Sequence, residues 1–178
     1  MNNPPTDAEI AQAVDTINRL PTGLLPQELF FAISHKTVLS SIELLPIRTN
    51  SKGESEILLT KRPADDPYWP NMWHIAGTIL RPTDQIGNFS SAFSRLFGDE
   101  FEGQLEVIGI PQYACTEFLD TGRGRVNDRV YFVEITSKEI SFPSGKFFSP
   151  NELPEDLIDH YDELIPKVYE TYLKNKKR

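Results

Sequence analysis

The chain has 178 residues, a formal net charge of −8, an isoelectric point near 4.9 and 39% hydrophobic residues. These values fit one globular domain with its own core, and they disfavour a nucleic-acid partner, because phosphate backbones attract basic surfaces. A nucleotide ligand remains compatible, since a bound cation can supply the positive charge. The single cysteine, Cys115, excludes an intrachain disulfide. We expect a cytoplasmic protein without a signal peptide or a membrane span.

The first 36 residues predict a helical extension in front of a main domain of residues 37–178. Thr6 and Asp7 are typical of a helix start. Apolar residues then recur at helical spacing: Ile10, Val14, Ile17 and Leu20. The apolar residues of 24–33 predict a second, shorter helix. The extension could cap the sheet or mediate a homodimer, and the sequence leaves both possibilities open.

Two strands joined by a turn open the main domain. Residues 38–48 (VLSSIELLPIR) and 56–61 (EILLTK) are apolar runs. The sequence Asn50-Ser51-Lys52-Gly53 between them is typical of a turn, so the two runs predict a β-hairpin. The next apolar stretch, from Trp73 to Ala76, predicts a short strand that ends at Gly77.

Residues 88–102 predict the helix around which the other elements are arranged. Its apolar residues share one face: Phe89, Ala92, Phe93, Leu96 and Phe97. Asn88 is a candidate N-cap and Gly103 a candidate C-cap. Asp99 and Glu100 put acid at the C-terminal end, where the helix dipole disfavours negative charge. Such a conflict is consistent with a functional site or with a solvated last turn.

The remaining residues predict further strands and a final helix. Residues 105–113 form an apolar run that we expect to break at Pro111, and residues 129–136 (RVYFVEIT) alternate as a strand does. Between them, 120–127 predict a basic, mobile hairpin loop. Residues 155–174 carry apolar side chains at helical spacing. The order of elements predicts an α+β fold with a mixed sheet between helices.

The stretch from Gly77 to Gly103 resembles a degenerate Nudix box, whose pattern is G-x5-E-x7-R-E-U-x-E-E-x-G-U with U aliphatic. Gly77 matches the opening Gly, Arg95 the Arg, and Asp99-Glu100 the Glu-Glu pair. The segments LLTKR, WHIAGT, RLFGDE and FFSPNELP, taken together, are similar to the same family. The resemblance covers roughly residues 38–174 and implies the α/β/α sandwich of the Nudix fold.

The resemblance also implies a metal site. In active family members the box acids and a carbonyl just before the box Gly hold Mg²⁺ or Mn²⁺, which here places the ligands at Asp99, Glu100 and the carbonyl of Ala76. Hard cations prefer oxygen donors, and a bound metal polarises phosphate and activates water. Glu100 would be the main ligand and a catalytic residue. Arg95 would support catalysis by bracing the helix through an i, i+4 pair with Asp99.

The chain departs from the box pattern at several positions. Leu96 stands where many family members have a Glu that acts as general base or metal ligand. Thr83 stands at the first Glu, with Asp84 beside it, and eleven residues separate Thr83 from Arg95 where the pattern has seven. The Arg-Leu pair is similar to the GDP-mannose mannosyl hydrolase branch, which takes its base from a His in a later loop. This chain has no His at the corresponding place.

Residues outside the box complete the candidate site. Asp128 is the acid that we nominate as a replacement base, with a capping or turn role as the alternative. Arg62 lies where family members hold a basic residue near substrate phosphates, and a solvated strand end is the alternative. Tyr68 and Trp69 could stack on a base or sugar, or simply pack. Arg123 could reach a phosphate, or only keep its loop soluble.

Two main functions are consistent with these features. The first is a metal-dependent hydrolase of a nucleoside diphosphate linked to another moiety, either a pyrophosphohydrolase or a nucleotide-sugar hydrolase. The second is a catalytically impaired Nudix-fold module that binds a nucleotide or a partner, which Leu96 and Thr83 favour. We expect the enzyme, because the two acids that matter most for metal are kept. A third possibility, another α/β domain with solvated acids, requires that no strand–loop–helix forms over residues 76–102.

Overall fold

The computed structural model of the chain describes residues 3–23, 25–85, 87–136 and 142–177. Residue 24, the first of the predicted second helical segment, lies outside these ranges. The described residues form the following elements in chain order: α1 (Asp7–Asn18), α2 (Gln27–Ser34), β1 (Val38–Thr49), β2 (Ser55–Lys61), β3 (Trp73–His74), β4 (Ala76–Ile79), α3 (Ser90–Asp99), β5 (Val107–Thr121), β6 (Gly124–Ile135), β7 (Gly145–Phe148) and α4 (Tyr161–Lys176).

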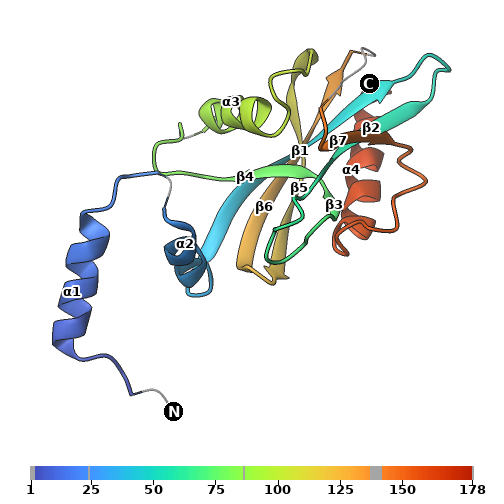
Figure 1. Cartoon of the computed structure of the whole chain (residues 1–178). Coiled ribbons are helices and arrows are strands. Elements are labelled where there is room, and N and C mark those ends of the chain that lie inside the picture. The colour runs from blue at the N-terminus through green and yellow to red at the C-terminus, as the bar shows by residue number, and fades with distance from the viewer. Residues whose placement is uncertain (1–2, 24, 86, 137–141, 178) are drawn as a thin grey trace.

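One mixed sheet forms the centre of the molecule (Figure 1). Its strand order is β3-β2-β1-β6-β5, while β4 pairs with β1 and β7 pairs with β2. Strands β1 and β6 are parallel, and the other strand pairs are antiparallel. The parallel register sets Ser41 opposite Asp128 and Glu43 opposite Val130. This pairing brings together side chains that are far apart in the sequence.

The two faces of the sheet are covered by different helices (Figure 1). Ile42 and Leu44 of β1 join a core cluster that includes residues of α3, such as Leu96. Leu45 and Ile47 point the other way and join a second cluster that includes residues of α4. Successive side chains of a strand face opposite sides of the sheet, which explains the alternation. The predicted α+β class and the α/β/α sandwich are therefore confirmed.

The central helix is shorter than the predicted 88–102. The N-cap position of α3 is Phe89, which has a left-handed backbone with φ +52°, so the predicted N-cap Asn88 is wrong. The Asn88 side chain accepts a hydrogen bond from the Ser90 N–H at 3.1 Å instead. The helix ends early because Glu102 and Gly103 are both left-handed, and the Gly103 N–H closes on the Phe97 carbonyl.

Four other predicted boundaries are wrong. Strand β5 continues through Pro111, because a register shift between Ile108 and Gln112 accommodates the residue without an N–H. The predicted loop over 120–127 is a tight turn, since β6 begins at Gly124, whose φ of +118° suits a reversal. The strand predicted to end at Gly77 continues in β4 to Ile79, and α4 begins at Tyr161 rather than at residue 155.

The N-terminal extension has two unlike helices (Figure 1). Thr6 and Glu9 form a capping box at the start of α1, yet α1 has no buried residue, and Ile10, Val14 and Ile17 are about half exposed. Helix α2 is anchored to the main domain, because the Ser34 hydroxyl donates to the Arg123 carbonyl at 2.6 Å. No helix within the described ranges is both long and apolar enough to cross a membrane. The division at residue 36 stays a prediction.

Candidate functional site

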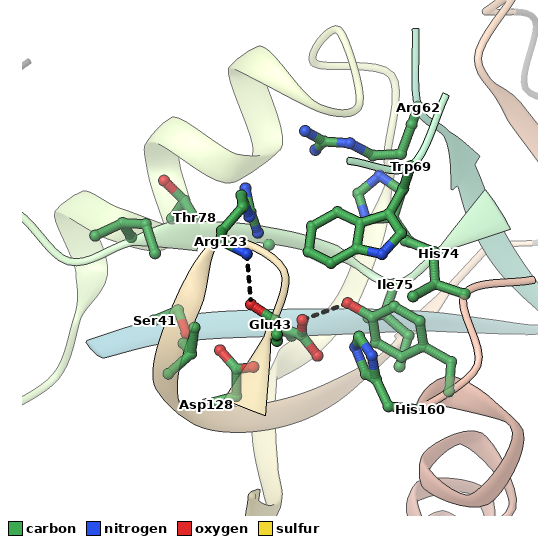
Figure 2. A pocket seen from close by; sticks show the side chains of 16 residues that line it. Ser41, Glu43, Arg62, Trp69, His74, Ile75, Thr78, Arg123, Asp128 and His160 are labelled. Carbon is green, nitrogen blue, oxygen red and sulfur yellow. Dashed lines mark hydrogen bonds between the residues drawn. The ribbon is translucent and has the colours of Figure 1, made fainter. Parts of the chain in front are cut away.

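Two adjoining hollows lie beside β4. We call the first the polar pocket, and its lining side chains are drawn in Figure 2. It is lined by Ser41, Glu43, Arg62, Trp69, His74, Ile75, Gly77, Thr78, Ile79, Thr121, Arg123, Val126, Asp128, Ile158, His160 and Tyr161. We call the second the outer hollow; it is lined by Glu100, by Arg81 and by residues of the N-terminal extension. The two hollows share Arg62, Gly77, Thr78, Ile79 and Arg123, so they adjoin along a common wall, and we call the two together the cleft.

Two buried carboxyl groups lie in the polar pocket (Figure 2). Glu43 of β1 and Asp128 of β6 are 6% and 5% exposed, and the register of the two parallel strands puts them on the same face as Ser41. The Tyr161 hydroxyl, at the start of α4, donates to Glu43 Oε1 at 2.5 Å. Among the described residues, neither Glu43 Oε2 nor Ser41 Oγ has a hydrogen-bond partner. The pocket therefore holds polar atoms whose hydrogen-bonding capacity is unused.

Burial dominates the electrostatics of this pair. It raises the pKa of Glu43 well above the ordinary value, and the charge of Asp128 raises it further. Burial also raises the pKa of Asp128 to about 6, against the opposing charge of Arg123. Two acids held this way destabilise the folded protein near neutral pH, because the charged forms are poorly solvated. Perturbed acids in a cleft are typical of functional sites.

Gly77 leaves little room for a side chain beside Glu43. A Cβ at residue 77 would lie 3.0 Å from Glu43 Cγ and 3.1 Å from the Ile42 carbonyl oxygen, both closer than normal contacts. The absence of a side chain thus lets Glu43 lie across β4. The opening Gly of the box pattern therefore has a physical role at this position.

Two guanidinium groups face the wall that the hollows share. Arg62 and Arg123 both line the polar pocket and the outer hollow. Burial lowers the pKa of Arg123, and the charge of Arg62 lowers it further, so the two cations lie close enough to repel each other. Within the described ranges Arg62 pairs with Asp66, whereas Arg123 has no ion-pair partner and lies over the Trp69 ring at 4.9 Å. An anion between them would relieve the repulsion.

Asp66 shapes the loop that carries the aromatic residues. Its Oδ1 accepts the N–H groups of Tyr68 and Trp69, both at 2.9 Å, and its Oδ2 accepts from Arg62. Trp69 lines the polar pocket, as a substrate-contacting residue must. Tyr68 does not line that pocket: its ring packs edge-on against Phe31 of α2 at 5.2 Å. The predicted aromatic pair is thus split between a pocket wall and a packing contact.

The box acids lie at the other end of the cleft. Glu100, partly buried, lines the outer hollow, whereas Asp99 is exposed. Burial raises the pKa of Glu100, Arg62 opposes that rise, and Asp99 adds to it. Leu96, one turn before Glu100, is fully buried in the α3 core cluster. Its packing role explains why a Leu is stable there and contributes no ligand.

The donor set near Glu100 fits a hard cation only in part. Over the described ranges no group of three or more Asp, Glu, His or Cys side chains is arranged to hold a metal. Asp99, Glu100 and the carbonyl of Ala76 supply oxygen donors only, which suits Mg²⁺ or Mn²⁺. Mg²⁺ sites commonly use one or two carboxylates and take further oxygens from substrate phosphates. Of the three, only Glu100 lines the outer hollow, so these residues provide oxygen donors of the right type without an assembled metal site in the described part of the chain.

Arg95 does not make the predicted pair with Asp99. Its two terminal nitrogens donate to the Asp84 carboxylate at 2.7 and 2.9 Å, and one of them also donates to the Ile79 carbonyl at 3.1 Å. The Asp84 carboxylate also accepts from the Ser91 hydroxyl, and hydrogen bonding to Arg95 lowers its pKa. Arg95 therefore fastens α3 to the loop after β4, because Asp84 lies within reach and Asp99 points to solvent.

Burial favours the neutral form of both histidines near the cleft. His74 of β3 is buried and hydrogen-bonded to the Thr60 hydroxyl at 3.1 Å, and burial lowers its pKa to about 3. Burial also lowers the pKa of His160, which lines the polar pocket just before α4.

Sequence reasoning missed Glu43 and Asp66, and it gave no role to Asp84. A charged residue inside an apolar strand such as VLSSIELLPIR is a usable signal for Glu43, since buried acids need a reason. Asp66 is followed by Pro67 and then by the two residues that it caps, which is a typical Asx-turn pattern. Asp84 became visible only through its contact with Arg95.

Comparisons with known proteins agree with this architecture. No family model and no curated protein matches the sequence. Among solved structures, the NUDIX domain of Shewanella oneidensis NrtR in complex with ADP ribose has a TM-score of 0.58 at 14% identity, over 82% of this chain and 98% of that one. Caenorhabditis elegans Ap4A hydrolase gives 0.56 at 14% identity, over 77% and 99%.

A third similar structure is a domain that was solved in complex with another protein. The C-terminal domain of mouse MUTYH, in complex with human PCNA, has a TM-score of 0.51 at 14% identity, over 79% of this chain and 91% of that one. Identities this low establish the arrangement of elements and not the activity. With the mixed sheet, the two covering helices and the strand–loop–helix from Ala76 to Asp99, they show that this chain has the Nudix fold.

Proposed function

We propose that the protein is a metal-dependent Nudix-type hydrolase of a nucleoside diphosphate linked to another moiety, a pyrophosphohydrolase or a nucleotide-sugar hydrolase. The single observation that carries this proposal is the shared wall of the cleft. Arg62 and Arg123, one of them without an ion-pair partner among the described residues, face the hollow that Glu100 also lines. Paired guanidiniums beside a partly buried carboxylate suit a polyphosphate and its counter-cation.

The residues divide the task along the cleft. Glu100, with Asp99 and the Ala76 carbonyl, would hold the Mg²⁺ or Mn²⁺, which when bound polarises phosphate and lowers the pKa of water. Arg62 and Arg123 would bind the phosphate oxygens and stabilise the charge that develops on them. Arg95 would position α3 through Asp84. The general base is unassigned on α3, since Leu96 is buried in the core.

Asp128 is the base nominated from the sequence, and its environment suits that role in one respect only. A pKa near 6 is close to the value that favours proton transfer near neutral pH. Asp128 lines the polar pocket and not the outer hollow that Glu100 lines. A base role would require the scissile bond to lie at the wall between them, so we propose Asp128 as a ligand-binding residue and leave the general base unassigned.

The test is product release from a panel of nucleotide sugars, dinucleotides and nucleoside triphosphates, with Mg²⁺ or Mn²⁺ and with a chelator. We expect metal-dependent turnover in the wild type, loss of turnover in Glu100→Gln, and full activity in the matched control Glu102→Gln, because Glu102 is exposed beyond α3. Metal-independent turnover, or equal activity in Glu100→Gln, would contradict the proposal.

A second candidate function is a nucleotide- or partner-binding module that has lost the chemistry. It is favoured by Leu96 in the core and by the fact that the described residues contain no three-acid cluster. The resemblance to the MUTYH domain that was solved with PCNA supports the partner-binding form of this candidate. Tight nucleotide binding in chelator, with no product from any substrate of the panel, would favour it over the hydrolase.

A further inference from the structure

The polar pocket contains buried polar atoms that lack a hydrogen-bond partner among the described residues. Glu43 Oε2 and Ser41 Oγ are buried without a partner among the described residues. No group in the same ranges donates to the Asp128 carboxyl, whose environment is set by burial and by the charge of Arg123. Buried polar groups in native proteins are nearly always satisfied, so these unused groups call for a hydrogen-bonding ligand from outside the chain, with Asp128, charged above about pH 6, as its acceptor.

The acceptors form one cluster and open into the cleft. Ser41 lies directly opposite Asp128 in the parallel register, and Glu43 follows two residues later on the same face of β1. Figure 2 shows the Glu43 and Asp128 side chains below Trp69 and Arg123, with His160 beside them. Tyr161 fixes one oxygen of Glu43, which leaves the other to face the pocket. Glu43 is therefore held in place before any ligand arrives.

Two features restrict what can bind there. The nearby cations Arg62 and Arg123 disfavour a ligand that is positively charged at this end, since both line the same pocket. Trp69 lines the same pocket, and an aromatic wall favours a flat ring system. A neutral ring that carries an amino group provides N–H donors without a positive charge. The lining residues thus favour an amino-substituted heterocycle over an ammonium group.

From this geometry we infer that Ser41, Glu43 and Asp128 recognise the exocyclic amino group of a nucleobase, so that the protein prefers nucleotides of adenine, guanine or cytosine to those of hypoxanthine or uracil. This inference rests on the proposed function for its choice of a nucleotide as ligand. The order along the cleft is consistent with it. Acceptors for the base come first, then Arg62 and Arg123 for the phosphates, and then Glu100 on the far side.

The test is equilibrium binding in chelator, which needs no turnover, with two pairs of nucleotides that differ at one position of the ring. These pairs are ADP against IDP and CDP against UDP, in which an amino group is replaced by an oxo group. We expect the amino member to bind about tenfold or more tightly in the wild type, the size expected for a hydrogen bond to a charged group. The preference should fall to within about twofold in the double variant Glu43→Gln/Asp128→Asn.

Two controls keep the result interpretable. Glu134→Gln, on the same strand as Asp128 but outside both hollows, should keep the wild-type preference. Both substitutions in the double variant preserve shape and remove buried charge, so the variant should fold; Ser41→Ala, with a smaller expected loss of preference, is a second and independent probe.

Failure of this inference is distinct from failure of the hydrolase. Equal affinity for both members of each pair, a preference that persists in the double variant, or no binding of any nucleotide would overturn the inference. An amino preference without turnover would support the inference and contradict the hydrolase. Metal-dependent turnover without an amino preference would do the reverse.

Discussion

The two pairs of acids in the cleft differ in where they lie and in how they can be found. Asp99 and Glu100 follow one another at the end of α3, one exposed and one partly buried, next to solvent. Glu43 and Asp128 come from two strands that are distant in sequence, and both are buried against the α4 side of the sheet. The first pair is a local motif. The second exists only because β1 and β6 pair in parallel.

The difference shows which acids suit which task. A metal ligand needs access to the cation and its water, so partial exposure at a helix end is acceptable. A group that discriminates between ligands gains from burial, because an unsatisfied polar atom in a dry pocket penalises the wrong ligand. The burial of Glu43 and Asp128 is expensive in stability, which is consistent with retention for function.

The largest expected effect concerns the ion pair between Arg95 and Asp84, which fastens the helix that carries Asp99 and Glu100. Asp84→Asn would leave the Arg95 guanidinium without its anionic partner, at a site where the two side chains are 5% and 13% exposed. We expect the free energy of unfolding to fall by about 3–5 kcal/mol, as for a broken buried ion pair. Urea unfolding measures it. A loss below about 1 kcal/mol would mean that Arg95 does not hold α3.

The next effect concerns the exposed pair itself. Glu100→Gln should lower kcat for the best substrate by about 10²–10³-fold, the range for loss of a group that stabilises developing charge. Steady-state kinetics at saturating Mg²⁺ checks this. If instead kcat recovers fully at higher metal concentration, Glu100 contributes only affinity for the cation.

The burial of Asp128 should make the free energy of unfolding depend on pH. The folded state binds the Asp128 proton more tightly than the unfolded state, since the pKa is about 6 against an ordinary 3.8. The contribution of Asp128 to the free energy of unfolding is therefore full below about pH 4. It is lost as the pH rises through 6, by about 3 kcal/mol in all.

It follows that Asp128→Asn should be more stable than the wild type at pH 8 by about 3 kcal/mol, and nearly equal to it at pH 4. Urea unfolding at both pH values, with Glu134→Gln as control, gives the comparison. A variant that is less stable than the wild type at pH 8 would show that the Asp128 carboxylate has a partner that stabilises it.

The smallest expected effect concerns Arg123, which lines both hollows between the two acid pairs. Arg123→Gln should weaken nucleotide binding by about tenfold, the contribution of one charge-assisted hydrogen bond. Arg125→Gln, an exposed residue of β6 two positions later in the chain, is the matched control. Equal affinities of both variants, measured by calorimetry, would remove Arg123 from the phosphate site.

The sequence predicted the fold well where periodicity decided it. The hairpin of β1 and β2 and the helix α3 follow from apolar spacing and turn residues alone. The boundaries failed where single backbone conformations decided them, as at Phe89 and at Gly124. Such positions depend on contacts made after folding: a Cβ at Gly124 would meet the Ser34 carbonyl oxygen at 2.4 Å.

The candidate site was predictable only at the exposed end. The spacing of Arg95, Asp99 and Glu100 can be recognised within one helix. The partner of Arg95 could not be predicted, because Asp84 lies in the loop before that helix. The burial of Asp128 and its proximity to Glu43 could be recognised only from the parallel register of β1 and β6. No periodicity in a single strand encodes which residue will lie opposite it in the next.

The most direct test of a division between the two acid pairs is to measure kcat and KM together for the wild type, Glu100→Gln and Glu43→Gln/Asp128→Asn, with the best amino-bearing substrate and its oxo counterpart. We predict that Glu100→Gln lowers kcat for both substrates alike. The double variant should raise KM for the amino-bearing substrate and leave kcat nearly unchanged. A double variant that loses kcat as Glu100→Gln does would contradict the division and would assign Asp128 to the chemistry.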